Sequence, residues 1–203
     1  MHASSARSLP IVVEMKSNGL LADLYSKDET KKEKAARFKL SNELKSKIDH
    51  FMPLYKAGDY EKALPVIIQG IEDIEKLNEQ NLNGLNDDLI YYKTRFEVYA
   101  LLSTNELGQY KESLEIADSA LKFDRWAPRK EYYKNRISAL KGQALLGLGR
   151  FDEAEPILVE EFDQLIKGEY PIYAIPIAKS LIELYKKTDQ PEKQKAWEAK
   201  AKY

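Results

Sequence analysis

The chain has 203 residues, of which 43% are apolar and 32% are charged, and its formal net charge is −1. This balance predicts no basic surface for nucleic acid, so we expect no nucleic-acid partner. The sequence contains no cysteine, which excludes disulfides, thiolate metal ligands and cysteine nucleophiles. No run reaches the roughly 18 apolar residues of a membrane span. We therefore expect no membrane insertion and a cytoplasmic protein, with a trimmed export signal as the open alternative.

Residues 1–30 show no sustained hydrophobic period, so we expect an irregular N-terminal arm. Gly19 and the run from Ser26 to Thr30 interrupt the pattern and leave one helical turn at residues 20–25. The apolar residues of this arm have two interpretations. They pack on the first helices, or the arm lies in a groove of its own chain or of a neighbouring copy. The second interpretation includes a homo-oligomer.

From residue 31 onward, apolar residues recur every three or four positions, which is the period of amphipathic helices. In the first helix this apolar stripe runs from Leu40 to Tyr55. The asparagine-rich residues 78–86 are predicted to form a loop. The whole pattern predicts eight helices, at residues 31–57, 60–77, 88–106, 110–123, 128–148, 151–166, 171–187 and 191–202.

Similar short segments separate the two helices of each successive pair. Gly58–Ala63 returns as Gly108–Ser113 and as Gly149–Ala154, with a weaker copy at Asp189–Gln194. Glycine permits left-handed backbone at a helix end, and an aromatic residue two positions later can pack between the paired helices. The steps between these turns are 50, 41 and 40 residues. Self-similarity at this period indicates stacked helical hairpins that bury their apolar faces against their neighbours.

The helix before each turn repeats as well. The segment Tyr91–Arg95 returns 41 residues later as Tyr132–Arg136, and Tyr173 stands at the corresponding offset before the fourth turn. In each tyrosine pair we expect one ring to pack between helices and the other to face solvent or a groove.

Three prolines interrupt the helical pattern. Pro65 and Pro156 each lie seven residues after their turn glycine, and Pro176 lies within the seventh predicted helix. A proline inside a helix removes one hydrogen bond and clashes with the carbonyl four residues earlier. We therefore expect mild kinks, or second helices that begin later than the pattern suggests. The shared register of Pro65 and Pro156 supports the repeat.

The turns resemble the tetratricopeptide repeat, which has a small residue in its first helix, a Gly-x-Tyr/Phe turn and an alanine three residues after the aromatic. The second unit has Ser113 in place of that alanine, and the units are near 40 residues rather than the usual 34 or so. The matching residues are Gly58, Tyr60 and Ala63 in the first unit, Gly108 and Tyr110 in the second, and Gly142, Gly149, Phe151 and Ala154 in the third.

This resemblance implies an all-α fold: an α-solenoid of about four antiparallel helix hairpins in a right-handed superhelix. It covers residues 31–203, with units at about 31–80, 86–125, 128–168 and 171–203. In such a fold the first helix of each pair lines an inner surface that holds an extended peptide or a partner helix. The implied function is that of a non-enzymatic scaffold that binds a protein or peptide.

A row of basic residues occupies one register of the predicted inner helices. Lys45, Arg95 and Arg136 each lie thirteen residues before a turn glycine. We predict that this row anchors carboxylates of the partner. The alternative is that these residues belong to an ordinary solvated face. The remaining candidates would bond the partner's backbone or give apolar and polar contact; the complete set is Lys45, Met52, Tyr55, Arg95, Val98, Leu102, Asn105, Arg136, Gln143, Lys179, Glu183 and Lys186.

The sequence shows no catalytic or metal-binding pattern. Its histidines are His2 and His50, without a metal-ligand spacing, and it has neither a nucleophile motif nor a phosphate-binding loop. We therefore expect no cofactor and no enzymatic activity. Two alternatives to a binding scaffold stay open. One is a ligand-sensing regulatory domain of a signalling or transcription-control system, and the other is an oligomeric structural component with the N-terminal arm in a groove.

Overall fold

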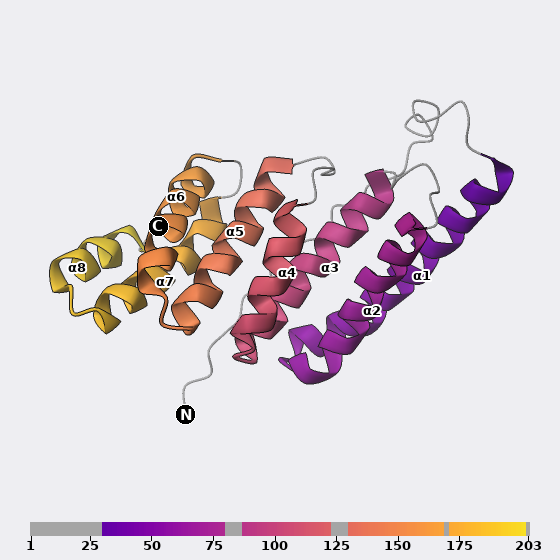
Figure 1. Ribbon diagram of the computed structural model, residues 1–203. Helices are drawn as coiled ribbons and strands as arrows, with labels where there is room; N and C mark the ends of the chain where they lie inside the picture. Colours follow the sequence, from indigo (N-terminus) through magenta and orange to yellow (C-terminus); the bar gives the residue numbers. More distant parts are fainter. Residues whose placement is uncertain (1–29, 80–86, 123–129, 169–170, 202–203) are drawn as a thin grey trace.

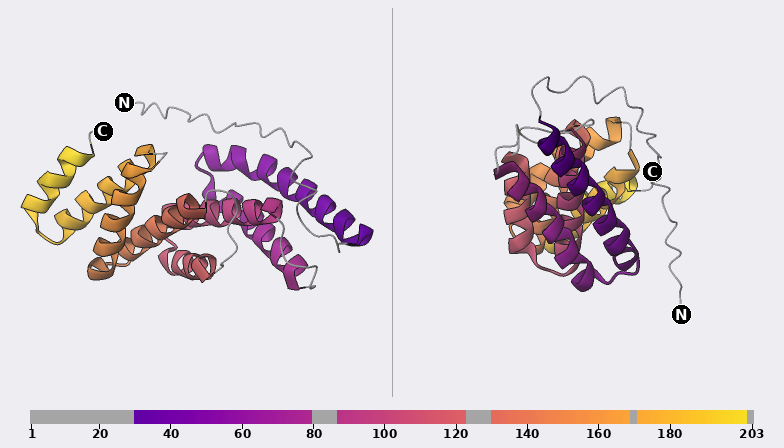
Figure 2. Two further views of the ribbon diagram at one scale, coloured as in Figure 1. Left: turned by 90° about the horizontal axis from the view of Figure 1, so that it is seen from above. Right: turned by 90° about the vertical axis from the view of Figure 1, so that its right-hand side faces the viewer.

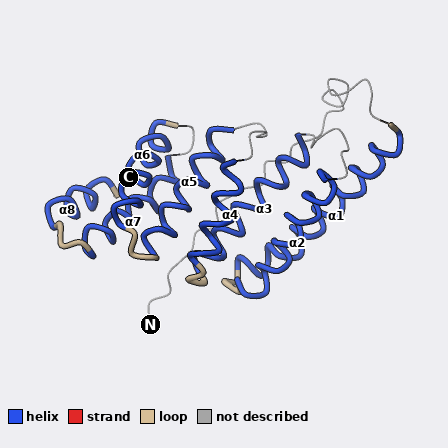
Figure 3. Tube along the Cα trace, in the orientation of Figure 1, coloured by secondary structure: helices blue, strands red, loops and turns tan. Residues whose placement is uncertain are grey.

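The computed structural model describes residues 30–79, 87–122, 130–168 and 171–201. Within these ranges the chain forms eight α-helices and one 3₁₀ helix, and no strand (Figure 3). The N-terminal arm with its expected helical turn and most of the asparagine-rich loop lie outside the described residues. The helices are α1 (Lys31–Lys56), α2 (Tyr60–Glu79), α3 (Asp87–Glu106), α4 (Tyr110–Lys122), α5 (Lys130–Gly147), α6 (Phe151–Lys167), η1 (Pro171–Tyr173), α7 (Ala174–Lys187) and α8 (Pro191–Lys200).

Each helix packs against the next one along the chain, so that the helices form one elongated row from α1 to α8 (Figure 1). The odd-numbered helices α1, α3, α5 and α7 also contact one another in succession. Within the described ranges, no two even-numbered helices have their backbones in contact. Figure 2 shows the same row from above and along its length. The expectation of an all-helical chain with neighbouring helices packed together is confirmed.

The four turns between paired helices share one hydrogen-bond geometry. In each, a backbone N–H just beyond the helix donates to a carbonyl five residues earlier, as from Asp59 to Leu54 at 3.0 Å and from Gln109 to Thr104 at 2.8 Å. The residue immediately before this N–H donor has a positive φ, which lies between 70° and 79° at the three turn glycines. Asp189 takes this place in the fourth turn with φ 53°. This arrangement satisfies carbonyls that the helix end leaves unpaired.

Two of the three prolines do not delay the start of their helices. α2 and α6 begin at Tyr60 and Phe151, so their prolines lie within the helices and the expected later start is wrong. The seventh helix was expected from residue 171, but η1 occupies residues 171–173 and α7 begins at Ala174. Pro176 is therefore in the first turn of α7, where its missing N–H would have no intrahelical acceptor.

The core is divided into three clusters along the row. The first joins α1, α2 and α3 as far as Ala100, and includes Phe51, Ile67 and Phe96. The last joins α5 to α8, and includes Leu158 and Leu181. The central cluster between them contains smaller side chains; its buried members are Val98, Leu101, Ala117, Ala120, Ile137 and Leu140.

Candidate partner-binding face

Tyrosines and arginines gather on the side of the row formed by the odd-numbered helices and η1. The repeat places an arginine four residues after a tyrosine on both α3 and α5, and residues at this spacing share one face of a helix. All the side chains in this group are half-buried. We call the group the tyrosine–arginine face; its residues are Tyr55, Tyr91, Tyr92, Arg95, Tyr99, Tyr132, Tyr133, Arg136 and Tyr173.

Arg136 lies at the centre of this face and is held by two tyrosines. Its Nη1 donates to the hydroxyl of Tyr132 at 3.0 Å, and its guanidinium carbon lies 4.7 Å from the centroid of the Tyr173 ring. No carboxylate among the described residues forms an ion pair with Arg136. The guanidinium is thus oriented by neutral groups, and its charge is not neutralised within the described part of the chain.

Arg95 also lies against a tyrosine ring, but at a greater distance. Its guanidinium carbon lies 5.5 Å from the centroid of the Tyr91 ring, and it has no ion-pair partner in the described ranges. The Tyr91 ring also contacts Tyr133 of the next unit, with centroids 6.5 Å apart. The neighbouring Lys93 is buried and pairs with Glu97 and with Glu75 of α2, the latter at 3.2 Å. Glu75 and Glu97 therefore form ion pairs with Lys93 and not with Arg95.

The face continues onto α1 through a pair of tyrosines. The Tyr55 and Tyr99 rings meet edge to face, with centroids 5.0 Å apart. Burial raises the pKa of the Tyr55 hydroxyl to about 12, with smaller contributions from Tyr60 and Tyr99, and the charge of Arg136 acts in the opposite direction. Because Arg136 acts electrostatically on both Tyr55 and Tyr99, side chains from α1, α3 and α5 share one electrostatic environment.

The two amides proposed to bind a partner's backbone are already bonded inside the protein. The Asn105 Nδ2 donates to the backbone carbonyl of Leu140 at 3.0 Å, and the Gln143 Nε2 donates to the hydroxyl of Ser180 at 3.0 Å. Each bond joins two successive odd-numbered helices. Asn105 and Gln143 therefore connect the units, and their amide N–H groups are not directed to a partner in this arrangement.

The other sequence candidates divide by burial. Val98 is only 3% exposed and belongs to the central core cluster, so it cannot contact a partner. Met52 and Leu102 are half-buried and pack against the core. Glu183 is exposed and pairs with Lys187 at 2.8 Å. The three candidate lysines, Lys45, Lys179 and Lys186, are all exposed.

The sequence candidates include neither Tyr99 nor the repeated tyrosines of α3 and α5. Tyr99 directly follows the buried candidate Val98, so the predicted register of α3 was one residue off at this position. The signal for the others was present, because Tyr132 and Tyr133 copy Tyr91 and Tyr92. The members of both pairs are half-buried, and each pair contacts a ring of another helix.

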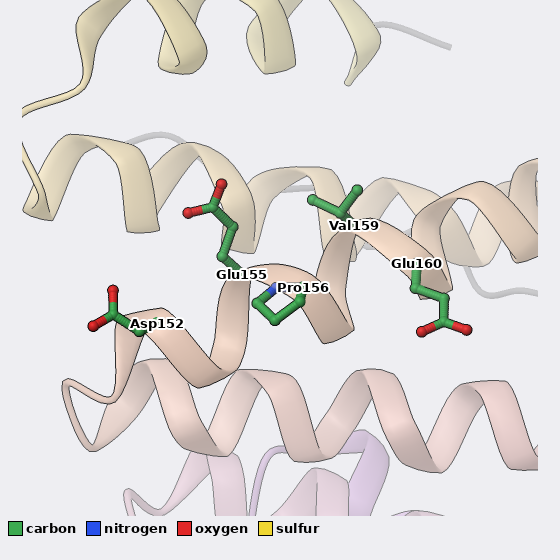
Figure 4. Close-up of a pocket in the computed structure, with 5 residues that line it drawn as sticks. All are labelled: Asp152, Glu155, Pro156, Val159 and Glu160. Atoms are coloured by element: carbon green, nitrogen blue, oxygen red, sulfur yellow. The ribbon is translucent and has the colours of Figure 1, made fainter.

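A surface hollow of about 510 Å³ lies along α6, and its lining residues come from that helix alone. They are Asp152, Glu155, Pro156, Val159 and Glu160 (Figure 4). Glu155 is already bonded by the Tyr185 hydroxyl at 2.8 Å and Lys193 at 2.9 Å. Among the described residues there is no group of three or more side chains that could hold a metal ion. In the same ranges, no helix has the length and apolarity needed to cross a membrane.

Comparisons of the chain with protein-family models, with curated proteins and with solved structures find no match.

Proposed function

We propose that the protein is a non-enzymatic scaffold that binds an acidic protein or peptide segment on its tyrosine–arginine face. The observation that carries this proposal is the state of Arg95 and Arg136. Both side chains are half-buried, both lie against tyrosine rings, and neither has a carboxylate partner in the described part of the chain. A partly desolvated charge is usually paired, and a carboxylate of the partner would supply the missing group.

The packing of the helices favours a curved stack. Odd-numbered helices contact one another and even-numbered helices do not, within the described ranges. The row is therefore shorter on the odd-numbered side, which would make this side the inner surface of a solenoid. We propose a solenoid of the tetratricopeptide type, with the right-handed superhelix that this resemblance implies. An extended segment lying across α1, α3 and α5 would contact both arginines.

The residue types of the tyrosine–arginine face are those that contribute most to binding free energy. Tyrosine and arginine are enriched among the residues that dominate interface energies. Since Tyr132 and Tyr173 already orient the Arg136 guanidinium, a partner would lose little side-chain entropy at this position. Hydrogen bonds to charged groups contribute about 1.5–3 kcal/mol each, so two arginines are sufficient to bias selection toward acidic sequences.

A selection from a random-peptide phage library tests this proposal. Purified wild-type protein should enrich peptides that contain Asp or Glu, whereas the Arg95→Gln, Arg136→Gln variant should lose that enrichment. The matched control is Lys76→Gln, Lys167→Gln, which removes two exposed charges from the even-numbered helices. Enrichment of the same acidic peptides by the arginine variant would reject the face as the binding surface.

A further inference from the structure

The helices α2, α4 and α6 each follow a turn glycine and can be aligned, and α4 has a smaller or more polar residue at two shared core positions. Five residues after the turn glycine, Ala63 and Ala154 correspond to Ser113. Nine residues after it, Ile67 and Leu158 correspond to Ala117. All of these side chains are fully buried. The central helix therefore fills the same positions with less apolar volume.

The described residues of α4 bury little apolar surface. The buried ones are Ser113, Ala117 and Ala120, while Leu114, Ile116 and Leu121 are only half-buried. Hydrophobic stabilisation scales with buried apolar area, so the described part of α4 is held more weakly than α2 and α6.

Unpaired polar atoms concentrate in the same hairpin. The hydroxyls of Ser103 and Ser113 and the Oδ1 of Asn105 are buried without a hydrogen-bond partner. The other such atoms among the described residues are in α6 and α1, the latter in Arg37, which has further interactions. A buried polar group without a partner costs free energy in the folded state, and opening to water recovers it.

We propose that α4 is less stable than α2 and α6, and that it opens locally before they do. This inference does not depend on the proposed function. It has a consequence for it, because α4 packs between α3 and α5, which carry Arg95 and Arg136. When α4 opens, the direct contacts between α3 and α5, such as the Asn105–Leu140 hydrogen bond, alone fix the relative positions of the two arginines.

Hydrogen exchange of the full-length protein, read by mass spectrometry, tests this order of stability. Amides of α4 should exchange at least roughly tenfold faster than the register-matched amides of α2 and α6. α2 is a stringent reference, because it belongs to the first described hairpin, where fraying is expected. Equal protection of α4 and its two counterparts would overturn the proposal.

Two substitutions test whether the buried Ser113 hydroxyl, and not the position of α4 in the row, causes the faster exchange. Ser113→Ala removes the unpaired hydroxyl and restores the residue found at positions 63 and 154, so exchange in α4 should slow at least about threefold while α2 is unchanged. The reverse change, Ala63→Ser, should accelerate exchange in α2. If Ser113→Ala leaves exchange in α4 unchanged or makes it faster, the buried hydroxyl does not weaken this hairpin and the proposal is wrong.

Discussion

The guanidinium carbon of Arg136 in α5 lies 4.7 Å from the centroid of the Tyr173 ring in η1. This contact joins the third and fourth helix pairs and orients a charge that has no carboxylate partner in the described ranges. The same side chain bonds the Tyr132 hydroxyl and acts electrostatically on Tyr99. Arg136 therefore contributes both to the packing between two helix pairs and to the proposed binding surface.

The stacking of Arg136 on Tyr173 should be measurable as a coupling energy. In a double-mutant cycle with Arg136→Gln and Tyr173→Leu, we expect a coupling of about 0.5–2 kcal/mol in urea denaturation, because a partly desolvated cation is attracted to the ring face. The control cycle combines Arg136→Gln with Tyr110→Leu, since Tyr110 packs at Gly147 instead. Equal couplings in both cycles would show that the stacking is not specific.

A substitution at Gly70 should lower stability although glycine is a poor helix residue. Gly70→Ala would ordinarily stabilise a helix interior by roughly 0.5–1 kcal/mol. Here the added Cβ would lie 2.6 Å from Cε1 of Phe96, so the aromatic ring must move. Overpacking of this kind costs typically about 1–3 kcal/mol, and we expect a net loss in urea denaturation.

A double variant checks whether the Phe96 ring is the cause. Phe96→Leu removes the ring, so Gly70→Ala should cost less in that background than in the wild type. An equal cost in both backgrounds would place the strain elsewhere.

The fourth turn should be stabilised by glycine. Asp189 has φ 53°, a left-handed backbone that L side chains rarely adopt, whereas the other three turns have glycine. Asp189→Gly should therefore raise the free energy of unfolding by roughly 0.5–1 kcal/mol. Asp189→Ala, which also removes the charge, should lower it. Stabilisation by both variants would indicate that the charge, and not the backbone, is the cause.

Stability should fall between about pH 4.5 and pH 7 because of Glu161. This side chain is 8% exposed and its Oε2 has no partner. Burial raises its pKa to about 7 from the ordinary value of 4.5, and Ser138 offsets this only in part. Since the folded state holds the proton more tightly than the unfolded state, the stabilisation is complete below the unfolded pKa and is lost as the pH rises through the folded value, on the order of 3 kcal/mol in all.

The measurement compares urea denaturation of the wild type and Glu161→Gln at several pH values. Other carboxylates titrate alike in both proteins, so the wild type should lose more stability between about pH 5 and pH 8 than the variant. Parallel pH profiles would show that Glu161 is ionised throughout. The charges nearest to it are Lys134 and Glu131 of α5 and Glu160 of α6.

The turns could be predicted from the sequence because their cause is local. Gly58, Gly108 and Gly149 are needed where φ is positive, and the pattern of apolar residues fixed the helices to within about three residues at each end. Even the fourth turn followed the rule, with Asp189 in the glycine position.

Contacts between units could not be predicted in the same way. The partner of the Asn105 amide is a carbonyl 35 residues further along the chain, and nothing near Asn105 in the sequence indicates it. The predicted register of α3 was also wrong by one residue at this point, since Val98 and Tyr99 are both apolar enough to be buried. Packing between α3 and its neighbours places Val98 in the core and leaves Tyr99 half-buried on the face.

Titration calorimetry with an acidic peptide selected by the wild-type protein tests the central proposal most directly. We expect the Arg95→Gln, Arg136→Gln variant to bind this peptide at least about tenfold more weakly, because each lost charge-assisted hydrogen bond costs about 1.5–3 kcal/mol. Lys76→Gln, Lys167→Gln should change the Kd less than about twofold. An unchanged Kd in the arginine variant would contradict the assignment of the tyrosine–arginine face as the partner-binding surface.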